Sequence, residues 1–133
     1  MTAVPVPRFL SAAVAVAVHD RQLAEHGGLN GVKDLGLLDS AIARPINKHS
    51  YGEEDPCALA AAYAFGIARN HPFLDGNKRT AWVMARLFLQ LNGVTITFDK
   101  ADAIRTMLAL AAGELPEEQV AAWFREHVVA ASG

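Results

Sequence analysis

The stretch "DPCALAAAYAFGIARNHPFLDGNKRTAWVMARLFLQLNG", residues 55–93, decides the fold, because two long apolar segments flank one short polar cluster. Asp55 is a typical helix N-cap with Pro56 at the first helical position, and the residues that follow are apolar on every face until Arg69. A second, mostly apolar helix is predicted to begin near Asn77 and to end with the stretch. Helices of this composition are buried, so we expect the two to pack on each other with the polar cluster bridging them.

Shorter helices are predicted before this stretch. The first is expected from Ser11 to about His26, where a glycine pair ends it. The glycine-rich segment 27–36 is unlikely to continue a helix and is interpreted as a flap. A short helix is predicted from Asp34 to Arg44, stopping at Pro45, with residues 46–54 as a second loop.

The remaining residues predict an extended segment and two more helices. Residues 94–98, "VTITF", alternate as a short extended piece. Asp99 then begins a helix that ends at Gly113, and an amphipathic helix follows from Pro116. On this last helix one face is expected to carry Val120, Trp123, Phe124, His127 and Val128. The predicted fold class is therefore all-α, a compact bundle of about six helices with a short flap, forming a single domain over residues 1–133.

Composition limits the classes of function. The chain has 133 residues, with 12 basic and 14 acidic side chains, so no basic excess favours direct contact with nucleic acid. The single Cys57 excludes an internal disulfide and points to a reducing, cytoplasmic setting. The apolar run 10–18 is weakly similar to a signal peptide, but the Ser11 cap and the continuing pattern favour a helix. No segment is long enough to span a membrane.

The polar cluster "HPFLDGNKRTAW", residues 71–82, suits an anionic ligand. The first turn of the helix that follows leaves its amides without intrahelical partners, and Gly76 lets a ligand approach the backbone. Lys78 and Arg79 add fixed positive charge. Asp75 could hold a magnesium ion that bridges phosphates. His71, largely neutral near pH 7, could take a proton from an attacking hydroxyl.

A structural loop and a P-loop are the two other interpretations of the cluster. A purely structural loop would use Asp75 and Asn77 as caps, Phe73 as a core anchor, and Lys78 and Arg79 as solvated charges. Each assignment is reasonable alone, but such a loop does not need all of these residue types together. A P-loop fails on spacing, because Asn77 stands where the glycine before the lysine should be.

The cluster resembles the signature of a known family. "HPFLDGNKR", residues 71–79, is similar to the signature of Fic-fold enzymes, which move a phosphate-containing part of a nucleotide onto a protein hydroxyl. The version "DGNKRTA", residues 75–81, resembles the Doc (death-on-curing) toxins of the Fic/Doc family. Segments 18–45, 58–71 and 88–96 also resemble Doc proteins, so the likeness extends over about residues 9–128.

The resemblance implies a role for each matching residue. His71 would be the general base, Phe73 the anchor of the loop and Asp75 the magnesium ligand. Gly76 and Asn77 would form the anion-binding turn, with Lys78 and Arg79 on the nucleotide phosphates. Arg69 matches an arginine of Doc proteins and is either a supporting phosphate contact or a cation facing the end of its helix.

The departures from the wider family bear on the reaction. AMP-transferring members generally have glycine at the position of Lys78 and a second arginine at the position of Trp82. The resemblance to Doc implies instead an ATP-dependent, magnesium-dependent protein kinase that phosphorylates a threonine of elongation factor Tu and arrests translation. An AMP transferase and a non-catalytic corepressor that only binds an antitoxin remain as alternatives.

The resemblance also implies partners. A Doc toxin is held inactive by an antitoxin whose C-terminal segment covers the active site, and it would meet operator DNA only through that antitoxin. The flap is either a simple connection or an edge on which the target segment docks. The remaining histidines, His19, His26, His49 and His127, lack metal-ligand spacing and are interpreted as structural or solvated.

Overall fold

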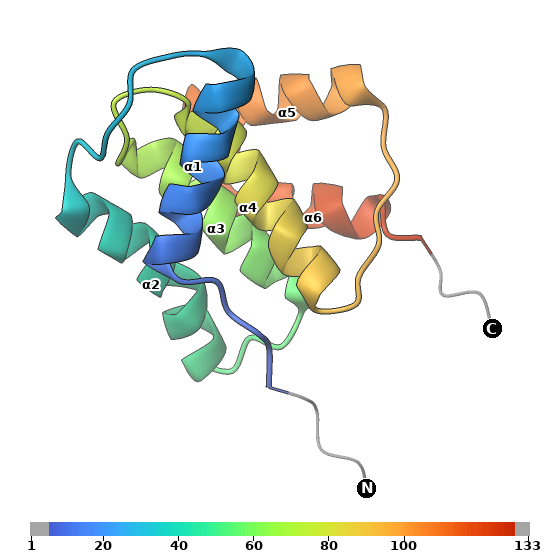
Figure 1. The fold of residues 1–133 in the computed structure, drawn as a ribbon. Helices are drawn as coiled ribbons and strands as arrows, with labels where there is room; N and C mark the ends of the chain where they lie inside the picture. The colour runs from blue at the N-terminus through green and yellow to red at the C-terminus, as the bar shows by residue number, and fades with distance from the viewer. Residues whose placement is uncertain (1–5, 130–133) are drawn as a thin grey trace, which may run out of the picture.

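The computed structural model describes residues 6–129, and its regular elements within that range are six α-helices, which confirms the all-α prediction (Figure 1). The helices are α1 (Ala12–His26), α2 (Leu35–Ser50), α3 (Pro56–Asn70), α4 (Asn77–Leu91), α5 (Lys100–Ala111) and α6 (Glu117–Glu126). None of the helices in the described part of the chain combines the length and the apolar character needed to cross a membrane.

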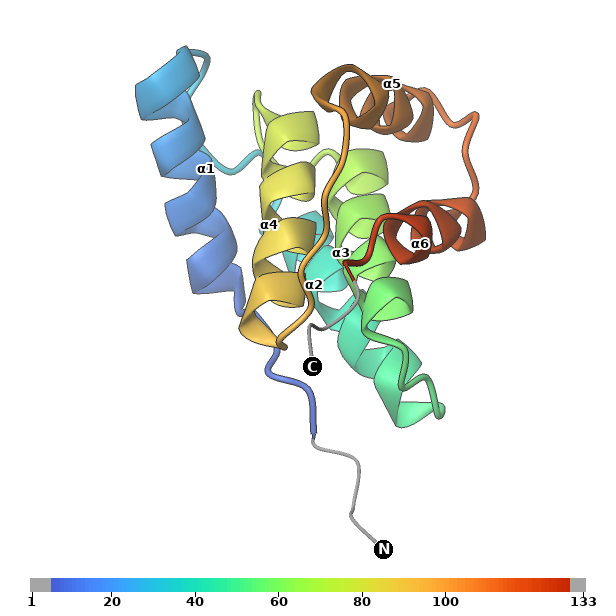
Figure 2. The same cartoon turned by 90° about the vertical axis from the view of Figure 1, so that its right-hand side faces the viewer.

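Helix α3 is the centre of the bundle. It packs against α2, α4, α5 and α6, while α1 lies on the far side of α4 (Figure 2). Eleven of its fifteen residues are buried, including Tyr63 and Ile67. Small side chains allow this close packing: a Cβ placed on Gly66 would lie 3.1 Å from Cα of Ala41 on α2. The prediction that the two apolar segments form packed, buried helices is confirmed.

Capping residues set several boundaries as the sequence predicts. The side chains of Ser11, Asp55 and Asp99 each accept a backbone N–H in the first turn of α1, α3 and α5. Asp34 does the same for α2. These four caps agree with the predicted starts, because a side-chain oxygen at this position satisfies a donor that the helix itself cannot.

The predicted end of the second helix is wrong. Helix α2 passes through Pro45 and ends at Ser50, so residues 46–50 are helical rather than a loop. Proline inside a helix costs about 3 kcal/mol. Here the apolar face continues across it: Pro45 is itself buried, one turn beyond the buried Ala41. Beyond the proline, Lys48 pairs with the buried carboxylate of Glu117 on α6, which holds the last turns in place.

The segment 94–98 is extended, as predicted, and pairs with the chain after α6. Ile96 and Val128 form an antiparallel bridge, with hydrogen bonds from Thr97 N–H to the carbonyl of His127 and from Val129 N–H to that of Thr95. Val120 and Phe124 are buried on the predicted face of α6. Val128 is not part of that helix, which ends at Glu126, because its backbone belongs to the bridge.

Tyr63 ties the chain before α1 to the central helix, and we expect Tyr63→Phe to be destabilising. Its hydroxyl accepts the N–H of Leu10 at 2.8 Å and donates to the Leu10 carbonyl at 3.1 Å. Phenylalanine leaves both buried backbone groups without a partner, so we expect a loss of about 2 kcal/mol in the free energy of unfolding at pH 7. Urea denaturation followed by circular dichroism measures it, and an unchanged midpoint would contradict the assignment.

The same tyrosine makes stability fall at high pH. Burial raises the pKa of Tyr63 to about 12, from 10.0 for an ordinary tyrosine. The unfolded chain therefore releases this proton at a lower pH than the folded chain, and stability falls as pH rises from about 10 to about 12. Tyr63→Phe lacks this group, so its stability should fall less over that interval than that of the wild type.

Candidate active site

The polar cluster lies in the turn between the two central helices. Helix α3 ends at Asn70, and His71 follows in the left-handed conformation, with φ 51° and ψ 56°. Among the described residues it is the one non-glycine with positive φ. Such a conformation is uncommon for residues other than glycine, although Asn, Asp and His adopt it more often than the rest, and it turns the chain sharply out of α3. This left-handed backbone turn sets the position of the exposed His71 side chain at the C-terminal end of α3.

The loop after His71 is held from inside by Asn77. The side-chain oxygen of Asn77 accepts the N–H of Phe73 and its amide nitrogen donates to the Phe73 carbonyl, both at 3.0 Å. Asn77 is 7% exposed and Phe73 1% exposed, so this clamp is buried. The prediction that Phe73 anchors the loop in the core is confirmed. The side chain of Asn77 is hydrogen-bonded within the loop itself. Only its backbone N–H is therefore available to donate to an anion.

The flap pairs with this loop. Val32 and Phe73 form an antiparallel bridge, and the Lys33 N–H donates to the carbonyl of Pro72 at 2.8 Å. On the other side of the bridge, Leu74 N–H donates to the carbonyl of Gly31 at 3.1 Å. The glycine-rich segment is thus more than a free connection, because its backbone is fixed beside the cluster.

Asp75 connects the loop to the flap through its carboxylate. One oxygen accepts the N–H of Gly76 at 2.8 Å and the other that of Leu29 at 3.4 Å. Gly28 makes this approach possible: it has φ +125°, and a Cβ placed on it would lie 2.9 Å from Oδ2 of Asp75. The carboxylate remains exposed and is oriented by two backbone donors from different segments.

This contact predicts a strong effect of Gly28→Ala. Alanine is strained at this positive φ, and its methyl group would also push the Asp75 carboxylate away from the flap. We therefore expect a loss of about 1 to 3 kcal/mol in unfolding free energy. Gly27→Ala is the matched control, because Gly27 also has positive φ but no atom within 4 Å of its added Cβ. Chemical denaturation of both variants tests the contact, and equal losses would show that only backbone strain is involved.

Helix α4 has an open N-terminus. Its N-cap is Gly76 in the left-handed conformation, with φ 73°, and no side chain caps it. Within residues 6–129 the backbone N–H groups of Asn77, Lys78 and Arg79 have no hydrogen-bond partner. The side chains of Lys78 and Arg79 are exposed in the same turn. Free amides, the positive end of the helix dipole and two cations together favour an anion here.

A surface pocket of about 570 Å³ brings part of the cluster together with α5. His71 and Lys78 of the cluster line it. The other lining residues come from α5 and the turn after it: Arg105, Leu108, Ala109, Ala111, Ala112 and Glu114. Its volume is in the range of small-molecule sites, and it combines cations with an apolar wall. Asp75 and Arg79 are not among its lining residues and lie at the neighbouring helix end.

Arg69 lies beside this pocket. Its guanidinium is 5.5 Å from the centre of the Phe65 ring, and its nitrogens would be 3.5 Å from a Cβ on Gly113. Arg69 is also in the last turn of α3, where a cation is favourable to the helix dipole. The structure thus places it against the end of α5, next to residues that line the pocket.

One carboxylate in the cluster could take part in metal binding. In the part of the chain that the structure describes, no group of three or more His, Cys, Asp or Glu side chains could hold a metal ion. Magnesium keeps several waters and is commonly bound by one or two carboxylates together with substrate phosphates. Asp75, next to free backbone amides, fits magnesium that arrives with a nucleotide.

Two residues of this region were not singled out from the sequence. Arg105 lies 27 residues after Lys78, and only the packing of α5 against α3 and α4 brings it to the pocket. His19, interpreted as structural or solvated, is structural: it is 1% exposed and contacts the loop directly. In the "VHD" triplet, residues 18–20, His19 is a polar residue on an otherwise apolar helix face. This was the feature of the sequence from which its contact with the loop could have been expected.

Comparison with known proteins agrees with this geometry. Residues 9–89 match the Fic/DOC family. The chain is 36% identical over 115 residues to "Protein kinase doc" of Escherichia phage P1, which covers 86% of this chain and 90% of that protein. It is 49% identical over 76 residues to "Toxin Doc" of Mycolicibacterium smegmatis, covering 55% of this chain and 58% of that protein. Because the matched segment contains the flap, the polar cluster, all of α3 and nearly all of α4, the chain belongs to the Fic/DOC family.

Proposed function

We propose that this protein is the toxin of a toxin–antitoxin pair and acts as an ATP-dependent protein kinase. The observation that carries the proposal is the uncapped N-terminus of α4, with free amides at Asn77, Lys78 and Arg79 beside the exposed imidazole of His71. The name of one relative, a protein kinase, supports the proposed activity, and the name of the other, a toxin, supports the proposed role. The proposed target is a threonine hydroxyl of elongation factor Tu.

The reaction would be a direct phosphoryl transfer. His71 accepts the proton of the threonine hydroxyl as its oxygen forms a bond to the γ-phosphorus, and the bond from that phosphorus to the β-phosphate oxygen breaks to release ADP. Positioning and charge neutralisation provide most of the catalysis in such transfers. The free amides, Lys78 and Arg79 would hold the phosphates, and bound magnesium, held through Asp75, would neutralise their charge.

The pocket beside α5 would hold the rest of the nucleotide. Its apolar wall, which includes Leu108 and Ala109, suits the base, and Arg105 adds a cation opposite Lys78. Arg69, placed at the end of α5, is a supporting cation in this arrangement. The flap, already paired with the loop on one edge, would present its backbone to the target segment.

The proposed partner in the resting state is an antitoxin. Its C-terminal segment would cover the active site, and any contact with operator DNA would be made through it. Apolar side chains that are at least half exposed surround the site, among them Leu29 on the flap, Leu74 in the loop of the cluster and Leu108 on α5. A segment that folds on binding needs such apolar surface to offset its ordering entropy. The expected compartment is the cytoplasm.

Intact-mass spectrometry of elongation factor Tu tests the reaction. We expect one added phosphate after incubation with this protein, magnesium and ATP, and none with a His71 variant. One added AMP would replace the kinase by an AMP transferase with the same base. No adduct on this target, in a sample where the protein still binds Mg·ATP, would contradict the proposed target.

A further inference from the structure

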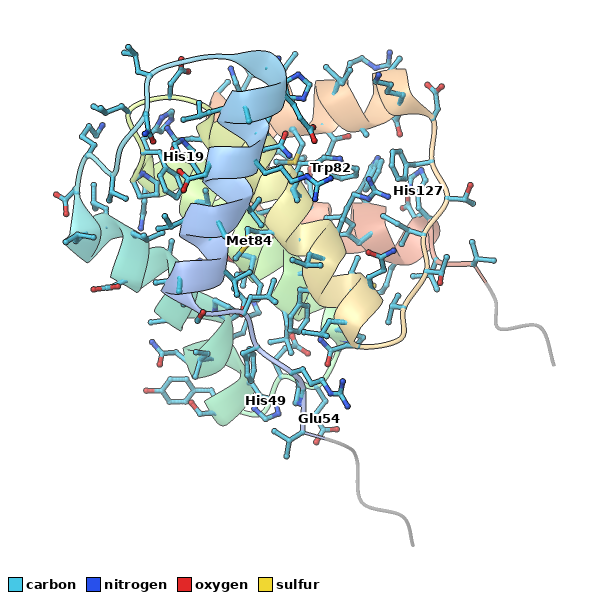
Figure 3. The ribbon with its side chains drawn as sticks, in the orientation of Figure 1. His19, His49, Glu54, Trp82, Met84 and His127 are labelled. Atoms are coloured by element: carbon cyan, nitrogen blue, oxygen red, sulfur yellow. The ribbon has the colours of Figure 1, made fainter. Side chains whose placement is uncertain are left out.

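His19 is a buried polar residue that the proposed reaction does not use. Apart from Ala15 it is the one buried residue that the structure gives for α1, and its side chain points from that helix toward the loop before α4 (Figure 3). Its ring stacks on Phe73, with ring centres 3.9 Å apart and planes inclined by 6°. This stack accounts for its burial, but not for a polar ring at this position.

The polar contact of His19 is with the backbone of Asp75. Its Nε2 lies 2.7 Å from the Asp75 carbonyl oxygen. A carbonyl can only accept, so Nε2 carries the hydrogen in this contact and donates it. The same edge of the ring lies beside Gly76, where an added Cβ would be 3.7 Å from Nε2. The imidazole thus contacts the peptide group that joins Asp75 to Gly76 from the side of its carbonyl oxygen.

The local backbone does not by itself fix the orientation of the peptide group between Asp75 and Gly76. In a trans peptide the C=O and the following N–H point in opposite directions. With its carbonyl held toward His19, the Gly76 N–H points away from the core, where it donates to Oδ1 of Asp75 at 2.8 Å. Gly76 is at φ 73°, and glycine populates positive and negative φ about equally, so this peptide could turn over at little local cost.

We propose that His19 is a positioning residue that locks the Asp75–Gly76 peptide. Through this lock it sets the direction of the Asp75 carboxylate and the start of α4, whose amides and cations form the proposed nucleotide site. The inference rests on the proposed function for its effect on nucleotide binding. Its effect on the loop itself is independent of any reaction.

Two substitutions distinguish the contribution of the His19 hydrogen-bond donor from that of its stacked ring. His19→Phe keeps a flat ring that can stack on Phe73 but removes the hydrogen donor. His19→Gln keeps an N–H donor of similar reach but removes the ring. Ala15→Gly is the matched control, since it loosens the buried face of α1 one turn away and leaves the His19 side chain unchanged.

Mg·ATP binding by isothermal titration calorimetry is the first readout, with thermal unfolding of each variant alongside. Residues that orient a metal ligand typically change affinity by 10- to 100-fold, so we expect about tenfold weaker binding in His19→Phe. His19→Gln should stay within about threefold of the wild type despite its lost packing. Ala15→Gly should unfold at a lower temperature with unchanged affinity. Affinities that follow the unfolding temperature across all three variants would overturn the proposal.

Amide hydrogen exchange is the second readout, and it needs no nucleotide. In His19→Phe the amides of Gly76 and Leu29, which both donate to Asp75, should exchange at least about tenfold faster than in the wild type, while buried α3 amides are unchanged. Unchanged exchange at both sites would overturn the lock. If the wild type binds no Mg·ATP, the proposed function fails, and the exchange rates still decide the role of His19.

Discussion

Replacing His71 by asparagine should abolish most phosphoryl transfer while leaving the fold as stable as before. A positioned general base contributes about 10²- to 10⁴-fold to such reactions, so we expect a loss of that size in the rate of target phosphorylation. Binding of Mg·ATP should change little, because the phosphate contacts are assigned to the amides and cations of α4. Single-turnover kinetics with saturating nucleotide measures the chemical step directly.

The backbone at His71 makes this prediction sharper. The residue is held at φ 51° and ψ 56°, a conformation that asparagine tolerates well and glycine tolerates best. His71→Asn should therefore change the unfolding free energy by less than about 0.5 kcal/mol, and His71→Gly should be as stable as the wild type or more so by up to about 1 kcal/mol. Inactive variants with undiminished stability would indicate that strain is retained for function. A variant that still phosphorylates at the wild-type rate would remove His71 from the mechanism.

Replacing Asn77 by alanine should destabilise the fold strongly. The substitution removes both hydrogen bonds to Phe73 and leaves a buried N–H and a buried carbonyl without partners. Each unsatisfied group costs about 1 to 3 kcal/mol, so the two together should cost about 2 to 6 kcal/mol in unfolding free energy. Urea denaturation measures this loss, and amide exchange of Phe73 should rise with it.

Asn77→Asp is the matched control for this clamp. It keeps the oxygen that accepts the Phe73 N–H but loses the donor to the Phe73 carbonyl, and it places a negative charge beside the proposed phosphate site. We expect it to unfold at least as easily as Asn77→Ala and to bind Mg·ATP more weakly still. If Asn77→Ala were as stable as the wild type but failed to bind nucleotide, its side chain would be a ligand rather than a clamp.

Local signals in the sequence were sufficient for most helix boundaries. Ser11, Asp55 and Asp99 each accept a first-turn N–H as their positions predict, because capping depends only on residues within one turn. The fully apolar character of residues 56–68 was likewise enough to predict a buried central helix. His71, Asp75 and Lys78 could be selected together because they are neighbours in the chain.

Long-range contacts account for what the sequence did not predict. The helix-ending effect of Pro45 is local, and it is outweighed by packing on α3 and by the pairing of Arg44 and Lys48 with Glu117, about 70 residues away. The contact of His19 with Asp75 spans 56 residues. Trp82 is also placed by such contacts: it is partly buried and lies in an aromatic cluster with Phe98, Trp123 and Phe124 that joins α4 to α6.

The most direct test of the account is to ask which phosphorus of ATP reaches the target. Elongation factor Tu is incubated with the protein, magnesium and ATP radiolabelled at either the γ- or the α-phosphorus, with His71→Asn as the control. The account predicts label on the target from the γ-position alone, and almost none with the variant. Label from the α-position would show AMP transfer instead, and γ-label that persists undiminished in His71→Asn would contradict the proposed base.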